Sequence, residues 1–327
     1  MKTYERNQTV DVMKGLSTIL VVYIHSHNMV CYAGVDCSNA IISFISYLTY
    51  AAVPTFFLIS AYLMSKSAKS YAENVRSKAK TLLLPYCIWI SLYIVAEAIG
   101  NRFLPTAFSD VSKWSGTDWM MNLIGIPFAD GPIYGPLWFV RDLFLLSLIA
   151  PILKAAVNKI PSYIMLPIIG GWYMPLPVHL RQALCFFLLG LLIGKGEIKL
   201  QNAFSKKEVT VTLLVVFVLL IALLPDGYFT ERTKKLMAAG LPYLVSRVLR
   251  CNWINLITDY SFWIYVTHGK LLSIIQITSV KMLPQSGTMI LVEYLVLPLI
   301  VISLCMAAGI IVHRLCPKLY STLTGGR

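Results

Sequence analysis

The chain has 327 residues, of which 57% are hydrophobic and only 13% carry a charge. Soluble globular proteins are roughly half apolar and a quarter charged, so this composition excludes an ordinary soluble protein. The 28 Lys and Arg outnumber the 15 Asp and Glu and give a formal net charge of +13. Such an excess would indicate nucleic-acid binding in a soluble protein. In a membrane protein, basic residues gather in cytoplasmic loops, so the excess gives information on the topology.

The seven cysteines form neither a CxxC pair nor a zinc-binding spacing, so no metal site is expected and most should pack as small apolar residues. Cys31 and Cys37 are the exception, because both fall in a short loop predicted to lie outside the cell, where a disulfide could persist. The first apolar stretch is long, follows a polar start and lacks a small-residue cleavage site. We therefore expect a retained helix instead of a cleaved signal peptide.

Ten segments approach the length of about 20 mainly apolar residues that a spanning helix needs. Two of them are weak: 162–177 is interrupted by Pro167 and a Gly pair, and 236–257 contains Arg247 and Arg250. The clear segments lie near 13–33, 41–64, 81–100, 137–153, 180–194, 209–225, 260–280 and 289–313. The sequence thus predicts an all-α, polytopic membrane protein in which residues 1–327 form a single domain.

The basic residues predict the orientation of these segments. Ten crossings place both termini on one side, and that side receives 19 of the 28 Lys and Arg. The positive-inside rule then makes both termini cytoplasmic, in a multi-pass protein of the inner (cytoplasmic) membrane. The longest outer loop, about 101–136, is rich in Trp, Gly and Pro. Topology thereby explains most of the basic excess without nucleic acid.

Ionisable residues within a membrane are costly and mark candidate functional sites. In the first helix, Asp11, Lys14 and His25 share one stripe along the helix. Lys14 and His25 are eleven residues apart, and at about 100° per residue this separation is within about 20° of three full turns. The helical rise places His25 about 16 Å deeper than Lys14. Histidine titrates near neutral pH, so His25 is a candidate general base. The structural alternative is that Lys14 snorkels, Asp11 caps the helix and His25 hydrogen-bonds to a neighbour.

A second candidate site is the basic run of Arg76, Lys78 and Lys80, which leads directly into an apolar segment. Arg76 and Lys80 are spaced i and i+4, so they would form one cationic face at the membrane surface. Such a face suits phosphates, either those of lipid headgroups or those of a soluble phosphorylated donor, and charge does not separate the two.

Two further motifs carry intramembrane ionisable groups. Gly135-Pro136 predicts a helix start, and Trp138 suits the membrane interface. Arg141 and Asp142 are adjacent and point about 100° apart, so we expect that they neutralise each other poorly and that at least one has a partner elsewhere or faces an aqueous cavity. His268 ends the stretch 261–268, where a histidine is more typical of a hydrogen bond between helices than of catalysis.

Together these motifs resemble the membrane-bound acyltransferase-3 family, and the resemblance covers nearly the whole chain. Lys14, ten intervening residues and His25, following Asp11, meet the family's first-helix pattern. The other similar stretches are 56–63, the basic run before 82–86, 137–140 and 261–268. Two positions depart from the family: Ala61 stands where a Gly is usual, which should affect packing, and Ala79 interrupts the usual Arg-x-x-Arg pair.

The resemblance implies a membrane O-acyltransferase that moves an acyl group, expected to be acetyl, from cytoplasmic acyl-coenzyme A to a hydroxyl of an extracytoplasmic carbohydrate, glycolipid or related envelope acceptor. Acyl-coenzyme A would be a co-substrate, with no permanently bound cofactor. The alternative is a transporter or uptake module for a small polar solute, which a cavity lined by His and Arg would serve equally well. The implied roles are catalysis by His25, as general base or acyl carrier, with Asp11; donor binding by Lys14, Arg76, Lys78 and Lys80; and an acceptor side formed by Trp138, Arg141 and His268.

Overall fold

The computed structural model of the protein describes residues 7–32, 39–103, 108–124, 134–171, 178–196, 206–225, 227–249, 253–283 and 286–326. Every regular element within these residues is a helix, which confirms the predicted all-α fold. The first half contains α1 (Gln8–Tyr32), α2 (Ala40–Thr49), α3 (Ala52–Ser65), α4 (Tyr71–Lys78), the π-helix η1 (Ala79–Leu83), α5 (Leu84–Phe103), the 3-10 helix η2 (Val111–Lys113), α6 (Gly116–Ile124), the 3-10 helix η3 (Gly135–Leu137) and α7 (Trp138–Lys159). The second half contains α8 (Ser162–Gly171), α9 (Val178–Lys195), α11 (Lys207–Leu223), α12 (Tyr228–Val248), α13 (Trp253–Asp259), α14 (Ser261–Met282), α15 (Gly287–Leu315) and α16 (Pro317–Thr324).

Four helical stretches among the described residues are long and apolar enough to cross a membrane, as expected for a multi-pass membrane protein. They are Ala40–Ser65, Tyr71–Phe103, Gly135–Lys159 and Gly287–Leu315. The count of ten crossings and the cytoplasmic termini stay predictions.

The two weak segments differ from single spanning helices. The 236–257 segment is divided, because α12 ends at Val248, where the extended backbone of Leu249 follows, and α13 begins at Trp253. In the 162–177 segment, α8 covers Ser162–Gly171, and residues 172–177 lie outside the described part of the chain.

α15 carries a clear sign of a lipid environment. One side of this helix is buried, with Tyr294 and Val301 fully enclosed. The opposite side exposes large apolar side chains, including Val296, Leu299 and Leu304. A surface helix of a soluble protein would place polar residues there, whereas a helix that is apolar on all sides suits the interior of a membrane.

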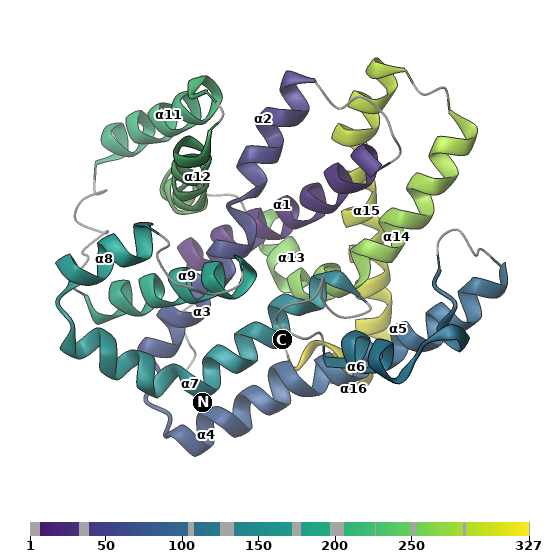
Figure 1. Ribbon diagram of the computed structural model, residues 1–327, viewed down its shortest axis with the longest axis horizontal. Coiled ribbons are helices and arrows are strands. Elements are labelled where there is room, and N and C mark those ends of the chain that lie inside the picture. Colours follow the sequence, from purple (N-terminus) through teal and green to yellow (C-terminus); the bar gives the residue numbers. More distant parts are fainter. Residues whose placement is uncertain are drawn as a thin grey trace.

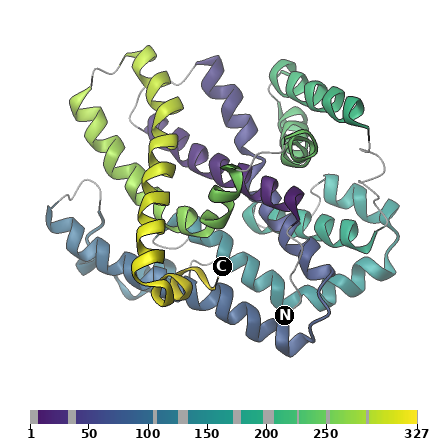
Figure 2. The same ribbon diagram turned by 180° about the vertical axis from the view of Figure 1, so that it is seen from behind.

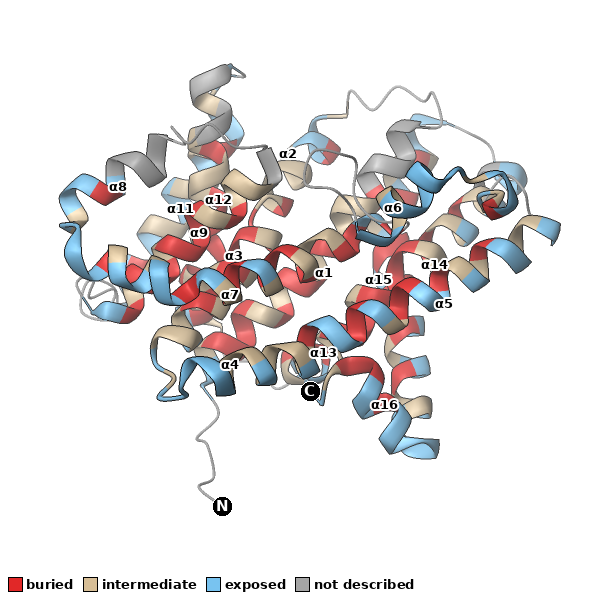
Figure 3. Cartoon of the chain, turned by 60° about the horizontal axis from the view of Figure 1, so that its bottom comes forward, coloured by how far each residue is buried: buried red, intermediate tan, exposed pale blue. Residues whose placement is uncertain are grey.

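α1 is the central helix of the fold (Figure 1). It contacts α2, α3, α12, α13, α14 and α15. α4, η1 and α5 follow one another as an unbroken helix along one edge of the molecule (Figure 1). Seen from behind, α15 stands upright beside α14, and α16 turns back at its lower end (Figure 2). There the Trp89 indole N–H of α5 donates to the Leu323 carbonyl of α16 at 2.9 Å. Figure 3 shows buried residues gathering on the inner helices and exposed ones on α4 and α16, whereas buried and exposed residues alternate along α5.

The described part of the predicted outer loop, 108–124, is ordered by its own acidic residues. Asp110 accepts from the hydroxyl and N–H groups of Ser112 at the start of η2, and these hydrogen bonds lower its pKa. Asp118 does the same with Ser115 at the start of α6, which lowers the pKa of Asp118. These caps explain two of the aspartates as structural elements of the loop.

Two glycines allow α3 and α9 to pack closely. A Cβ atom at Gly190 would collide with the Leu58 carbonyl oxygen and lie 2.8 Å from the Cβ of Ala61, and a Cβ at Gly194 would collide with the Ser65 hydroxyl. The spacing of Gly190 and Gly194 is that of small-xxx-small helix contacts in membranes. Ala61, the departure from the family glycine, is fully buried at this contact, so its side chain is part of the α3–α9 packing.

We therefore expect Gly190→Leu to separate α3 from α9 and to lower stability by about 1–3 kcal/mol, the usual cost of overpacking. Thermal unfolding of the detergent-purified protein measures this change. Gly287→Leu is the matched control, since nothing lies within 4 Å of a Cβ at that position. Equal unfolding temperatures for the two variants would contradict the close contact.

Candidate active site

The structure brings together two histidines that the sequence places in different motifs. His25 of α1 and His268 of α14 face each other with ring centroids 5.1 Å apart and ring planes at 46°. His268 is fully buried and His25 partly buried. α1 runs unbroken from Gln8 to Tyr32, so the predicted stripe that joins His25 to Asp11 and Lys14 is present. His268 therefore adjoins the predicted catalytic residue directly.

The hydrogen bonds of His268 define which ring nitrogen carries its proton. Nδ1 lies 3.0 Å from the carbonyl oxygen of Ile264, which can only accept, so we assign the proton to Nδ1. The Tyr134 hydroxyl lies 3.4 Å from the same nitrogen. Nε2 then bears a lone pair, and it is buried with no hydrogen-bond partner among the described residues. A buried acceptor left open in this way is available to a substrate hydroxyl or to a proton.

Three tyrosines hold α14 in place around His268. The Tyr134 hydroxyl accepts from the Gly269 N–H at 2.9 Å, and the Tyr134 ring stacks on Tyr93 with centroids 4.3 Å apart. The Tyr93 hydroxyl donates to the Val266 carbonyl, and the Tyr265 hydroxyl donates to the Pro136 carbonyl of η3. The residues preceding α7 and the α5 helix are thus tied to the backbone that carries His268.

Tyr265 had a sequence signal, because it lies three residues before His268 in the 261–268 stretch and so on the same helix face. Tyr93 and Tyr134 had none, because their roles depend on contacts between distant segments.

Gly269 makes room for Tyr134. A Cβ atom at this position would lie 2.6 Å from Cε2 of Tyr134 and 2.7 Å from its hydroxyl oxygen. We expect Gly269→Ala to displace the tyrosine, disturb His268 and reduce the rate of catalysis at least about tenfold, corresponding to the loss of about 1.4 kcal/mol of transition-state stabilisation. Initial rates of the purified variant test this. Gly135→Ala is the control near the same turn, since nothing lies within 4 Å of its added Cβ; a fully active Gly269→Ala variant would contradict the positioning role of Tyr134.

An ion pair with a buried carboxylate fixes α14 two residues after His268. Lys270 of α14 pairs with Glu97 of α5, whose other carboxylate oxygen accepts from the Ser109 N–H. Glu97 is only 1% exposed. Breaking a buried pair by removing one partner leaves an uncompensated charge, so this contact fastens the helix that carries His268.

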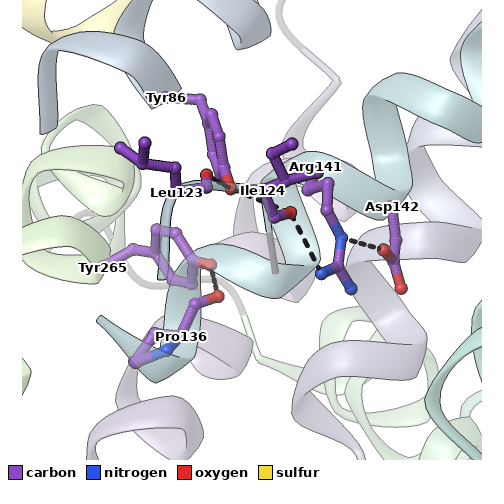
Figure 4. A network of polar contacts seen from close by, with 7 residues as sticks. All are labelled: Tyr86, Leu123, Ile124, Pro136, Arg141, Asp142 and Tyr265. Carbon is purple, nitrogen blue, oxygen red and sulfur yellow. Dashed lines mark hydrogen bonds and ion pairs between the residues drawn. The ribbon is translucent and has the colours of Figure 1, made fainter. Parts of the chain in front are cut away.

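Arg141 and Asp142 differ from the sequence prediction. The Arg141 Nε donates to the Asp142 Oδ1 at 2.8 Å, so the expectation that these neighbours neutralise each other poorly is wrong. Their Cα–Cβ bonds point in different directions around the helix, but the arginine side chain is long enough to reach the neighbouring carboxylate. The expected partner elsewhere is also present, because an Arg141 guanidinium nitrogen donates to the Ile124 carbonyl at 3.4 Å. Figure 4 shows this network, with Tyr86 donating to Leu123 at 2.9 Å.

Trp138, also predicted on the acceptor side, lies half-buried with its ring 6.2 Å from that of Phe57. It therefore packs against Phe57 of α3, and its place at a membrane interface stays a prediction.

The predicted donor-binding residues lie on α1 and on the contiguous helices α4 and η1. Lys14 is partly buried on α1. Arg76 and Lys78 are on α4 and Lys80 is on the π-helix η1, with Arg76 and Lys80 exposed. Asp11 is buried, and Asn7 caps the start of α1 by accepting from the Val10 N–H at 3.3 Å. The side chain of Cys31 and all of Cys37 lie outside the described residues, so the disulfide considered for them stays a prediction.

Comparison with known proteins decides the family. Residues 7–313 match the acyltransferase-3 family model, which is described as an acyltransferase domain. This chain belongs to the acyltransferase-3 family. It is also 26% identical over 300 residues to the succinoglycan biosynthesis protein ExoH of Rhizobium meliloti (strain 1021), covering 84% of this chain and 79% of that protein. No solved structure matches.

Membership of the family confirms the resemblance that the motifs indicated and makes the protein a membrane O-acyltransferase. It favours the enzyme over the transporter alternative. The matched range includes both His25 and His268. The two histidines thus lie together inside the acyltransferase domain itself.

Proposed function

We propose that this acyltransferase-3 protein transfers an acyl group, in the first instance acetyl, from cytoplasmic acyl-coenzyme A to a hydroxyl of an extracytoplasmic polysaccharide or related envelope acceptor, and that it acts in the inner membrane. The observation that carries the chemistry is the contact between His25 and His268, with an open lone pair on Nε2 of the latter. Its similarity to a succinoglycan biosynthesis protein supports a polysaccharide acceptor.

The chemical step follows from the histidine pair. His25 accepts the proton of the acceptor hydroxyl as the oxygen attacks the thioester carbonyl. The carbon–sulfur bond then breaks, and the coenzyme A thiolate leaves and takes up the proton that His25 holds. The open Nε2 of His268 accepts a hydrogen bond within the same site and orients the reacting hydroxyl or the His25 ring. Acyl transfer through a covalent acyl-histidine would use the same pair in two steps.

Donor binding is proposed for the cations nearest to the cytoplasm in the predicted topology. Arg76 and Lys80 are exposed and can reach the phosphates of coenzyme A, and an arginine can bind phosphate with two parallel hydrogen bonds. Lys14, on the stripe that leads to His25, is placed to hold the donor further along α1.

Release of coenzyme A tests the proposed function. The purified protein is incubated with acetyl-coenzyme A in detergent, with and without a bacterial exopolysaccharide, and free thiol is measured. We expect thiol release that increases with the acceptor, together with acetyl groups on the glycan detected by mass spectrometry. A protein that leaves acetyl-coenzyme A intact while moving a solute across vesicle membranes would overturn the proposal in favour of transport.

A further inference from the structure

A cavity lies apart from the histidine pair. It has a volume of about 650 Å³ and is enclosed by the first turns of α1, the last turns of α3 and α9, and parts of α11 and α12. None of the residues assigned to catalysis, donor or acceptor binding lines it. A volume of this size matches that of ordinary ligand sites in proteins.

The interior of the cavity is mainly apolar. Its walls include Leu58 of α3, Phe186 and Leu189 of α9, and Leu236 and Leu244 of α12. Such walls offer few hydrogen-bond partners to a sugar or a nucleotide, and burial of a polar group without a partner is unfavourable. The interior therefore fits a hydrocarbon chain.

The rim of the same cavity carries positive charge. Lys66, just after α3, and Arg247, in the last turn of α12, both line it and are both exposed. The helix ends that meet here lie on the side of the membrane that the sequence predicts to be basic and cytoplasmic. Basic pockets between membrane helices on that side bind the headgroups of anionic lipids.

The combination of an apolar interior and a cationic rim points to one occupant. We propose that this cavity binds an anionic phospholipid of the cytoplasmic leaflet, with its phosphate at Lys66 and Arg247 and an acyl chain between α3, α9 and α12. The lipid then fills the space between α3–α9 and α11–α12 and holds these helix pairs together. This inference does not depend on the acceptor or on the mechanism of acyl transfer.

Native mass spectrometry of the full-length protein, delipidated in detergent, tests the proposal with added phosphatidylglycerol and with zwitterionic phosphatidylcholine of the same chains. We expect one phosphatidylglycerol to bind in preference to phosphatidylcholine. The double variant Lys66→Gln, Arg247→Gln should weaken this binding at least about tenfold, because it removes both charges at the rim. The matched control is Lys206→Gln, Lys207→Gln, which removes two exposed cations outside the cavity and should leave binding unchanged.

A third variant tests the interior. Ala239→Leu adds bulk to a buried residue of the cavity wall and should weaken phosphatidylglycerol binding while leaving the rim charges intact. Equal binding of the two lipids, or equal loss in the Lys206–Lys207 control, would overturn the proposal. The proposal would also be overturned if acetyl-coenzyme A displaced phosphatidylglycerol while the Ala239→Leu variant still bound phosphatidylglycerol. These two results together would assign the rim to the acyl donor.

Discussion

Replacing His25 with alanine is expected to abolish acyl transfer while leaving the helical fold and membrane insertion intact. The side chain lies on the central helix α1 and faces His268, so its loss removes the proposed proton acceptor from the acyltransferase domain. General acid–base catalysis by one side chain contributes about 10²–10⁴-fold to a rate, and a loss of that size or larger should be measured as coenzyme A release.

The matched control for this variant is Tyr23→Phe. Tyr23 lies on the same helix and its hydroxyl donates to the Leu295 carbonyl at 2.8 Å, so removal of the hydroxyl costs one structural hydrogen bond away from the histidines. We expect this control to keep most of its activity and to unfold at a slightly lower temperature. His25→Ala protein that is correctly folded and still transfers acetyl at the normal rate would remove His25 from the mechanism.

The second large effect is expected at His268, where two substitutions separate a chemical role from a structural one. The Nδ1–H of His268 donates to the Ile264 carbonyl, whereas Nε2 is open. The side-chain amide of asparagine lies close to the position of Nδ1, and the side-chain amide of glutamine reaches the position of Nε2. We expect His268→Asn to retain the fold but to lose transfer by about 10²-fold or more, and His268→Gln to retain part of the activity through an acceptor at the position of Nε2.

Rates and unfolding temperatures of both variants should be measured together. If His268 serves only to fasten α14, the order reverses: asparagine would preserve stability and activity, and glutamine would lose both. The pH dependence gives a second readout, since a histidine that exchanges protons during turnover shapes the pH–rate profile and a purely structural one does not.

Local patterns in the sequence predict the parts of this site that depend on one helix. The stripe of Asp11, Lys14 and His25 follows from helical periodicity alone, and α1 carries it as predicted. The contact between His25 and His268 depends on how α1 and α14 pack against each other, which no local pattern contains. The sequence placed His268 on the acceptor side and favoured a hydrogen-bonding role for it, whereas the structure puts its ring beside that of His25.

The wrong prediction for Arg141 and Asp142 has a specific physical cause. The angle between neighbouring Cβ atoms constrains short side chains, but the several rotatable bonds of arginine allow Nε to reach the next carboxylate. The prediction of one helix over 236–257 failed for a different reason. Hydropathy is averaged over a window of residues, so it does not detect a single extended residue such as Leu249, which ends α12 before α13 begins.

The π-helix η1 sets the angular register between the two ends of the continuous helical stretch Tyr71–Phe103. A π turn closes i→i+5 hydrogen bonds and so accommodates one residue more than the α-helix on either side of it. In η1 this extra residue falls within Ala79–Leu83, between the cations Arg76 and Lys78 and the aromatic residues of α5. Relative to an uninterrupted α-helix, the cations are rotated by about 100° around the axis. A regular α-helix that kept both the cations and the aromatic residues of α5 in their present directions would need one residue fewer in this turn, so the direction of the cations depends on the number of residues here and not on their identity alone.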